Sequence, residues 1–214
     1  MTDVKFCGLT READAKFASS VAARYAGVIF AGGPRELPPS HAAAVLGAAD
    51  ATVHRVGVFG ADFRDRIPLV LGQVSLDVVQ LHADPTVADV RAARALFDGA
   101  VWAAVRVRGA EIPARTAELF GEADAVVLDA MAGEALGGTG ARIPWPDVAD
   151  ALALIRAGAT LVLAGGLTSA NVRDAIVMLT PDIVDVSSGV ESAPGVKDHE
   201  RMTAFIHAVR GNDQ

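Results

Sequence analysis

Eight short apolar runs rich in β-branched residues alternate along this chain with eight segments of helical character. The apolar runs predict strands at residues 4–7, 27–30, 54–59, 77–81, 101–107, 125–128, 160–164 and 183–186. The other segments predict helices at residues 12–24, 40–49, 62–71, 86–97, 113–119, 146–155, 169–179 and 197–209. The strands are almost continuously apolar, as expected when helices cover one face of a parallel sheet and side chains fill the other. The pattern therefore predicts an α/β fold.

Two parallel architectures fit this pattern, an open doubly wound sheet and a closed (β/α)8 barrel of the TIM type. Eight strand–helix units favour the barrel. A doubly wound nucleotide-binding protein usually carries a GxGxxG turn after its first strand, and Cys7-Gly8-Leu9-Thr10-Arg11-Glu12 does not match it. No linker or change in composition divides the 214 residues. We expect a single (β/α)8 barrel with eight parallel strands, forming one catalytic domain over residues 1–214.

Composition excludes several classes of function. The net charge is −7, with no basic run and only two tryptophans and one tyrosine, so we expect no nucleic-acid partner. The N-terminus lacks a signal pattern and no apolar segment reaches about 18 residues, so we expect no membrane partner and a cytoplasmic location. One cysteine and five histidines without ligand spacing predict no metal site.

Two loops carry residues suited to binding phosphate, which in such barrels usually lies near the loops after strands seven and eight. Gly165 and Gly166 follow the seventh predicted strand, and Ser187, Ser188 and Gly189 follow the eighth. Glycine lets backbone N–H groups approach an anion closely, and hydroxyl groups can donate further hydrogen bonds. Either loop alone could be a plain tight turn. Their occurrence on neighbouring strands favours a phosphate site.

Three further side chains follow predicted strands at the same end. Cys7, the only cysteine, is either a small core residue or a thiolate base or nucleophile. Asp129 directly follows a strand, where its carboxyl group either caps a loop or takes part in chemistry. Arg35 is either solvated or offers its planar fork to a carboxylate or phosphate. The glycine-rich loop at residues 133–140 could close over a bound substrate.

Together these residues resemble the phosphoribosylanthranilate isomerase family of tryptophan biosynthesis, in family order from residue 4 to residue 198. The matching motifs are Lys5-Phe6-Cys7-Gly8-Leu9-Thr10, Pro34-Arg35, Gln80-Leu81-His82, Leu128-Asp129, Gly137-Gly138-Thr139-Gly140, Ala164-Gly165-Gly166-Leu167, Asn171-Val172, Asp185-Val186-Ser187-Ser188-Gly189-Val190-Glu191 and Gly195-Val196-Lys197-Asp198. Two positions depart from the family pattern. Gly33 stands where the family often has serine, and Ala83 where it often has glycine.

The resemblance implies an Amadori rearrangement of N-(5-phosphoribosyl)anthranilate, without metal or organic cofactor. By similarity, Asp129 is the general acid that protonates the furanose ring oxygen and Cys7 is the base that removes the C2 proton. Arg35 would bind the anthranilate carboxylate. The remaining substrate-binding residues implied are Gly138, Gly165, Gly166, Ser187, Ser188 and Gly189. His82 either lines the pocket or makes a structural hydrogen bond.

The resemblance also implies a type of partner and an oligomeric state, and two other functions remain as alternatives to the isomerase. The partner would be a small phosphorylated substrate, and the protein a monomer or a homodimer. A histidine-pathway isomerase, or a dual-substrate enzyme, is the nearest rival, but in that family an aspartate ends the first strand where this chain has Cys7. A sugar-phosphate-binding barrel without activity is the rival from another class.

Two physical expectations concern the interior of the barrel. Lys5 shares a strand face with Cys7, and barrel closure makes the first and eighth strands neighbours, so Lys5 and Asp185 should form a buried ion pair. A thiol base working at neutral pH should also have a pKa below about 8.5, although burial without a positive neighbour would raise it instead.

Overall fold

The computed structural model describes residues 1–130, 144–156 and 158–211. Within these residues, eight parallel strands close into a barrel in sequence order, so the predicted (β/α)8 fold is confirmed. The strands are β1 (Asp3–Phe6), β2 (Tyr25–Ile29), β3 (His54–Phe59), β4 (Val78–Leu81), β5 (Ala100–Val107), β6 (Ala125–Ala130), β7 (Leu161–Leu163) and β8 (Ile183–Val186).

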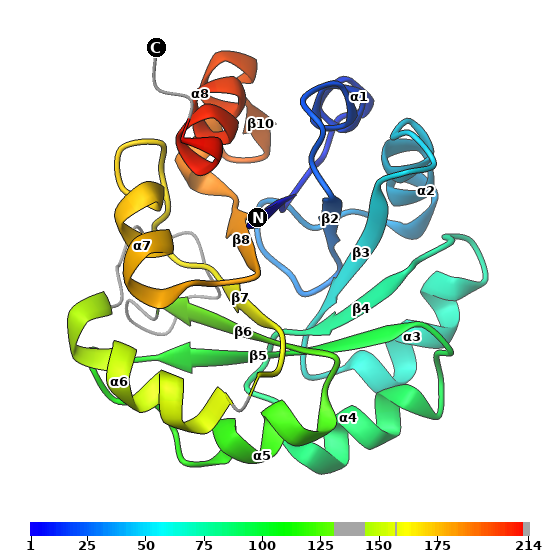
Figure 1. The fold of residues 1–214 in the computed structure, drawn as a ribbon. Helices are drawn as coiled ribbons and strands as arrows, with labels where there is room; N and C mark the ends of the chain where they lie inside the picture. Colours follow the sequence, from blue (N-terminus) through cyan, green and yellow to red (C-terminus); the bar gives the residue numbers. More distant parts are fainter. Residues whose placement is uncertain (131–143, 157, 212–214) are drawn as a thin grey trace.

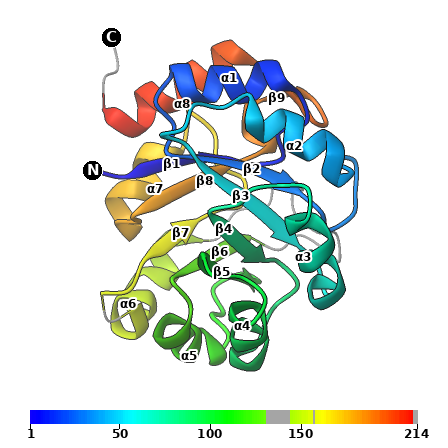
Figure 2. The ribbon, with the colours of Figure 1, turned by 90° about the vertical axis from the view of Figure 1, so that its right-hand side faces the viewer.

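Helices form a ring outside the strands (Figure 1). They are α1 (Glu12–Ser20), α2 (Pro39–Gly47), α3 (Phe63–Leu71), α4 (Val87–Arg94), α5 (Arg115–Glu122), α6 (Trp145–Arg156), α7 (Val172–Leu179) and α8 (His199–Arg210). Figure 2 shows the strands between α1, α2 and α8 on one side and α4, α5 and α6 on the other. The strands are therefore buried on both faces, which explains their continuous apolar sequences.

Side-chain alternation divides the strand residues between two cores. One set packs beneath the helices, and the other forms a separate apolar cluster inside the barrel that includes Val78, Val127 and Ile183. Because side chains two residues apart share a face, the residues two positions further along these strands also point inward, and they are the polar residues Gln80, Asp129 and Asp185. The apolar cluster thus lies below a polar layer at the C-terminal ends of the strands.

Most helix boundaries differ from the sequence prediction, and three of the differences have a clear local cause. Helix α1 ends at Ser20 instead of residue 24, because the chain turns through Ala22, whose φ is 56°, to enter β2. Helix α7 begins at Val172 instead of residue 169, since Asn171 is engaged with the preceding loop. Helix α8 begins at His199, where the side chain of Asp198 accepts hydrogen bonds from the first-turn N–H groups.

A short hairpin precedes α8 and was not predicted. Its strands, β9 (Glu191–Ala193) and β10 (Val196–Lys197), follow the 3-10 turn η1 (Ser188–Val190). They pair antiparallel, with Lys197 opposite Glu191. The backbone oxygen of Gly195 accepts a hydrogen bond from Thr10, and that of Lys197 accepts one from Arg11 at 2.8 Å. These contacts fix the hairpin to the loop after β1.

Candidate active site

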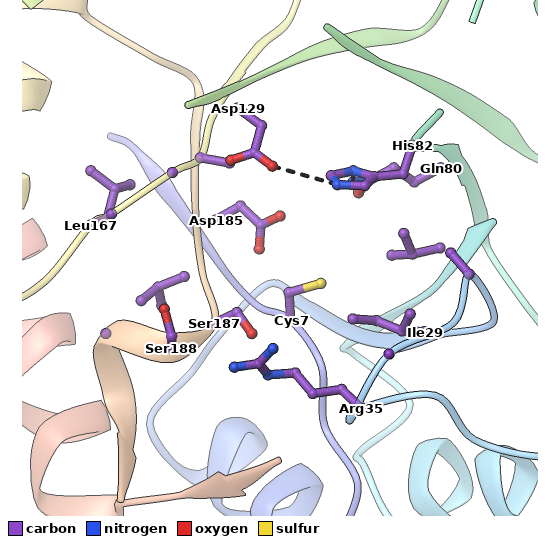
Figure 3. A pocket seen from close by; sticks show the side chains of 18 of the residues that line it. Cys7, Ile29, Arg35, Gln80, His82, Asp129, Leu167, Asp185, Ser187 and Ser188 are labelled. Carbon is purple, nitrogen blue, oxygen red and sulfur yellow. Dashed lines mark hydrogen bonds and ion pairs between the residues drawn. The ribbon is translucent and has the colours of Figure 1, made fainter. Parts of the chain in front are cut away.

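A cavity of about 580 Å³ opens at the C-terminal ends of the barrel strands. All of the predicted site residues that the structure describes line it: Cys7, Arg35, His82, Asp129, Gly165, Gly166, Ser187, Ser188 and Gly189. In the view of Figure 3, Leu167, Ser187 and Ser188 lie on one side of the pocket and Gln80 and His82 on the other. Gly138 and the loop at residues 133–140 lie outside the described residues.

Cys7 follows β1 and is buried at the floor of this pocket. Burial raises the pKa of the thiol above its ordinary value, although the positive charges of Lys5 and Lys197 act to lower it. The expectation of a lowered thiol pKa was therefore wrong. Lys5 and Asp185 together bring almost no net charge to the thiol, so they do not outweigh the loss of solvation.

Asp129 lies at the end of β6, and its carboxyl group is almost fully buried. Burial first, and then repulsion from Asp185, raise the pKa of Asp129 from 3.8 to about 7. The opposing charges of Lys5 and Arg106 are smaller influences. A carboxyl group with this pKa is partly protonated at neutral pH, which is what a general acid requires.

His82 faces Asp129 across the pocket, as Figure 3 shows, with its Nε2 atom 3.5 Å from Oδ2 of the carboxyl group. Burial and the charge of Lys5 lower the pKa of His82 to about 4, so the imidazole is neutral at neutral pH. The Nε2 atom of Gln80 lies 3.5 Å from Nδ1 of the ring. An amide in this orientation donates toward Nδ1 and leaves the ring proton on Nε2, facing Asp129.

Lys5 and Asp185 form the predicted ion pair, with Nζ and Oδ2 separated by 2.6 Å. They occupy facing positions in the β1–β8 register, and the Lys5 side chain is fully buried. The other carboxylate oxygen, Oδ1, is buried with no hydrogen-bond partner among the described residues. Asp185 lines the cavity, so this buried acceptor lies in a residue that borders the pocket.

Arg35 reaches the pocket from the loop after β2. Its guanidinium group forms an ion pair with Glu191, a residue to which the sequence analysis assigned no role. Its Nε and Nη2 atoms donate to Oε1 and Oε2 of Glu191 at 2.8 and 2.7 Å. Lys197 donates to the same carboxylate at 2.8 Å. The alternative of a solvated Arg35 is therefore wrong. The arginine stem lies over Gly8, where an added Cβ atom would approach Cδ of Arg35 to 2.6 Å.

The loops after β7 and β8 touch through a glycine. A Cβ atom on Gly189 would lie 1.9 Å from the backbone oxygen of Leu167, so only glycine permits this approach. Asn171 fixes the first loop, accepting from the N–H of Thr168 at 2.8 Å and donating to the oxygen of Gly166 at 2.9 Å. Among the described residues, no hydrogen bond is found for the N–H groups of Gly166 and Leu167. Such N–H groups are suited to an anion.

Gly165 has a structural reason for being glycine. Its φ is 86°, and an added Cβ atom would lie 2.3 Å from the backbone nitrogen of Ala130 at the end of β6. The residue therefore brings the loop after β7 close to Asp129. The positive φ and the close approach fit the tight-turn alternative at Gly165, and anion binding by this loop stays a prediction.

No three histidine, cysteine, aspartate or glutamate side chains of the described residues form a group that could hold a metal ion. None of the helices in this part of the chain has the length and apolar character needed to cross a membrane.

The fold and the position of the pocket define the class of the (β/α)8-barrel enzymes, in which the active site lies at the C-terminal ends of the strands. The family model described as N-(5'phosphoribosyl)anthranilate (PRA) isomerase matches residues 4–208. The chain belongs to this family.

Relatives and solved structures agree with that membership. The chain is 36% identical to the N-(5'-phosphoribosyl)anthranilate isomerase of Pseudomonas fluorescens over 207 residues, or 96% of this chain and 97% of the relative. It is 38% identical to that of Ralstonia pickettii over 221 residues, covering 99% and 94% of the two chains. The crystal structure of phosphoribosyl anthranilate isomerase from Thermotoga maritima superposes with a TM-score of 0.86 at 32% identity, covering 99% of this chain and 100% of that one.

A further similar structure contains a ligand. It is a phosphoribosyl anthranilate isomerase in complex with reduced 1-(o-carboxyphenylamino)-1-deoxyribulose 5-phosphate. The TM-score is 0.82 at 31% identity, and the match covers 99% of this chain and 100% of that one.

Proposed function

We propose that this protein isomerises N-(5'-phosphoribosyl)anthranilate to 1-(o-carboxyphenylamino)-1-deoxyribulose 5-phosphate in tryptophan biosynthesis, with Asp129 as general acid and Cys7 as general base. The observation that carries the proposal is the presence of both groups in one cavity, where Asp129 has a pKa of about 7. Membership of the isomerase family supports the same reaction.

The reaction needs one acid and one base. Asp129 donates its proton to the ribose ring oxygen as the bond between that oxygen and C1 breaks, leaving an iminium ion at C1 and the nitrogen. Cys7, as the thiolate, takes the proton from C2, and the C2–H electron pair forms an enamine that tautomerises to the C2 ketone. The iminium charge acidifies the C2 proton, so a base that is mostly protonated at rest can still act through its minor thiolate form.

Substrate anions would be held at two sides of the pocket. Arg35, which lines the pocket, would bind the carboxylate of the anthranilate ring through its guanidinium group. The loops carrying Gly165, Gly166, Ser187, Ser188 and Gly189 would bind the phosphate, using backbone N–H groups such as those of Gly166 and Leu167, which have no partner among the described residues. Gly138 stays a candidate substrate contact from outside the described residues.

Two other polar groups would contact the sugar. The Oδ1 atom of Asp185, which has no partner among the described residues, would accept a hydrogen bond from a substrate hydroxyl, and this bond would satisfy a buried acceptor. His82 would line the pocket as a neutral ring and direct its Nε2 proton at Asp129, which combines the two roles considered for it.

Residues 1–214 would then act as one catalytic domain in the cytoplasm, as a monomer or a homodimer. A histidine-pathway or dual-substrate activity is less well supported, because Cys7 directly follows β1 at the position where that family has an aspartate. A barrel that binds sugar phosphate without turnover is disfavoured by the presence of an acid and a base in the same cavity.

The direct test adds the protein to freshly prepared phosphoribosylanthranilate in chelator-treated buffer. Consumption of the substrate is measured as the loss of its fluorescence. We expect acceleration well above the spontaneous background, and the same rate from Leu154→Ser, a change at an exposed position on α6. No acceleration by the wild-type protein would reject the proposal. Turnover of the bisphosphorylated histidine-pathway substrate at a comparable rate would favour the dual-substrate alternative.

A further inference from the structure

The hydrogen bonds of Arg35 divide its guanidinium group into two edges. The edge formed by Nε and Nη2 is occupied by both carboxylate oxygens of Glu191, at 2.8 and 2.7 Å. The donors on Nη1, with the second N–H of Nη2, are left to the pocket that Arg35 lines. A carboxylate that enters the pocket can therefore be bound by a second parallel pair of N–H groups without displacing Glu191.

Glu191 would cancel the charge of Arg35 if the two were alone. Lys197 prevents this, because its Nζ atom lies 2.8 Å from Oε1 of Glu191. The ammonium group also donates to the backbone oxygen and the hydroxyl of Ser187, at 3.1 and 3.4 Å. Its three N–H donors thus have three acceptors, as a buried ammonium group requires. The cluster of Arg35, Glu191 and Lys197 carries one net positive charge.

The fold holds this cluster rigidly. Glu191 and Lys197 face each other across the β9–β10 hairpin, and their side chains are about 5% and 0% exposed. The backbone N–H of Lys197 donates to the buried carboxylate of Asp14 at 3.2 Å, and the hairpin is also fixed by Thr10 and Arg11. The carboxylate that orients Arg35 therefore has little freedom to move.

From these contacts we propose that Glu191 and Lys197 are positioning residues for substrate recognition. Glu191 orients the guanidinium group so that its free edge faces the carboxylate of the aromatic ring, and Lys197 preserves the net positive charge that attracts it. The inference rests on the proposed function, since it assumes a substrate with an aromatic carboxylate. The proposed function assigns Arg35 as the ligand of the substrate carboxylate. The inference adds which residues make Arg35 selective for ligands that carry this carboxylate.

The test compares two ligands that differ only in the carboxylate. One is the reduced product analogue, reduced 1-(o-carboxyphenylamino)-1-deoxyribulose 5-phosphate. The other is the same molecule with an unsubstituted phenyl ring, which lacks the carboxylate. Dissociation constants are measured by calorimetry for the wild type, Glu191→Gln, Lys197→Met and the double variant. Glu122→Gln, at an exposed ion pair with Arg91, serves as control.

We expect the wild type and Glu122→Gln to prefer the carboxylate ligand. Each single variant should lose about tenfold or more of that preference while affinity for the phenyl ligand stays nearly constant. Lys197→Met leaves the cluster neutral, whereas Glu191→Gln with Lys197→Met restores one net positive charge. The double variant should therefore recover part of the preference lost by Lys197→Met.

A merely structural role would lower affinity for both ligands equally, and that result would overturn the inference. Variants that keep the full carboxylate preference would overturn it as well. Neither outcome would affect the proposed function, which fails separately if the wild type binds neither ligand. Substrate kinetics give a second measurement, since a positioning role should raise KM more than it lowers kcat.

Discussion

The ammonium nitrogen of Lys5 lies 2.6 Å from Oδ2 of Asp185, and both side chains are buried inside the barrel two residues before Cys7 and Ser187. Burial is the largest single influence on the pKa of Lys5 and lowers it, but the attraction of Asp185 and of the thiolate form of Cys7 together leave the pKa raised. Lys5 therefore stays charged, and the pair sets the electrostatic environment of both Cys7 and Asp129.

Replacing Lys5 by methionine should destabilise the protein by about 3–5 kcal/mol, because Asp185 would be left as a buried charge without a partner. Chemical denaturation at pH 7 measures this loss. Lys5→Met combined with Asp185→Leu should be clearly more stable than Lys5→Met alone. Equal stability of the single and double variants would show that the stranded charge is not the cause.

Asp129→Asn and Arg35→Ala should impair turnover in different ways. Loss of a general acid should lower kcat by roughly 10²–10⁴-fold, whereas loss of a carboxylate ligand should mainly raise KM. Steady-state kinetics of phosphoribosylanthranilate consumption separate the two effects. If Asp129→Asn changes only KM, the carboxyl group is a binding residue and not the acid.

Asp129→Asn should also stabilise the protein at alkaline pH. The pKa of Asp129 is about 7 in the folded protein, above its ordinary value of 3.8, so the folded state binds this proton more tightly than the unfolded state. The wild type therefore loses stability as the pH rises from about 4 to 7, by up to about 4 kcal/mol. Unfolding at pH 8 should show the gain for Asp129→Asn, and the gain should shrink toward pH 4. A gain independent of pH would contradict the raised pKa.

Gly189→Ala should weaken anion binding, because the added methyl group would lie 1.9 Å from the oxygen of Leu167 and force the two loops apart. Inhibition by inorganic phosphate should weaken about tenfold or more. Gly121→Ala is the matched control, since a methyl group at that position in α5 meets nothing within 4 Å. Unchanged phosphate inhibition in Gly189→Ala would place the anion elsewhere.

Most of the fold could be predicted from the apolar runs, because eight of them can be identified in the sequence without knowledge of any tertiary contact. The alternation of side chains along a strand placed Lys5 and Cys7 on one face and, with barrel closure, paired Lys5 with Asp185. Residues that directly follow strands could be assigned to the site because every strand of a parallel barrel ends at the same rim.

Other parts of the site have no local signal. Glu191 meets Arg35 across 156 positions of the chain, through a hairpin whose strands have only three and two residues, too short for a periodic pattern. The pKa of Cys7 could not be inferred from its neighbours alone, because its direction is set first by burial. The need for glycine at 189 depends on a contact with Leu167 that only the folded chain brings about.

The raised pKa of Cys7 predicts a distinctive pH dependence. Alkylation of this thiol should accelerate through an apparent pKa above that of an ordinary cysteine, and kcat/KM should rise between pH 6 and 7 as the thiolate fraction grows. Above pH 7 the loss of protonated Asp129 offsets this gain, so the profile should become flat. Rates of iodoacetamide labelling and of turnover, measured over the same pH range, check both points.

The central claim is that Cys7 and Asp129 act together in this cavity, and reversible modification of Cys7 tests it most directly. Methyl methanethiosulfonate can react only at Cys7, the only cysteine in the chain, and the small S-methyl group is removed again by dithiothreitol. Turnover of phosphoribosylanthranilate should fall in proportion to the modified fraction, reach the background rate at full modification, and return on reduction. Cys7→Ser, which leaves the space open, should be nearly inactive and insensitive to the reagent. Fully modified protein that turns over substrate at the unmodified rate would contradict the account and return Cys7 to the role of a core residue.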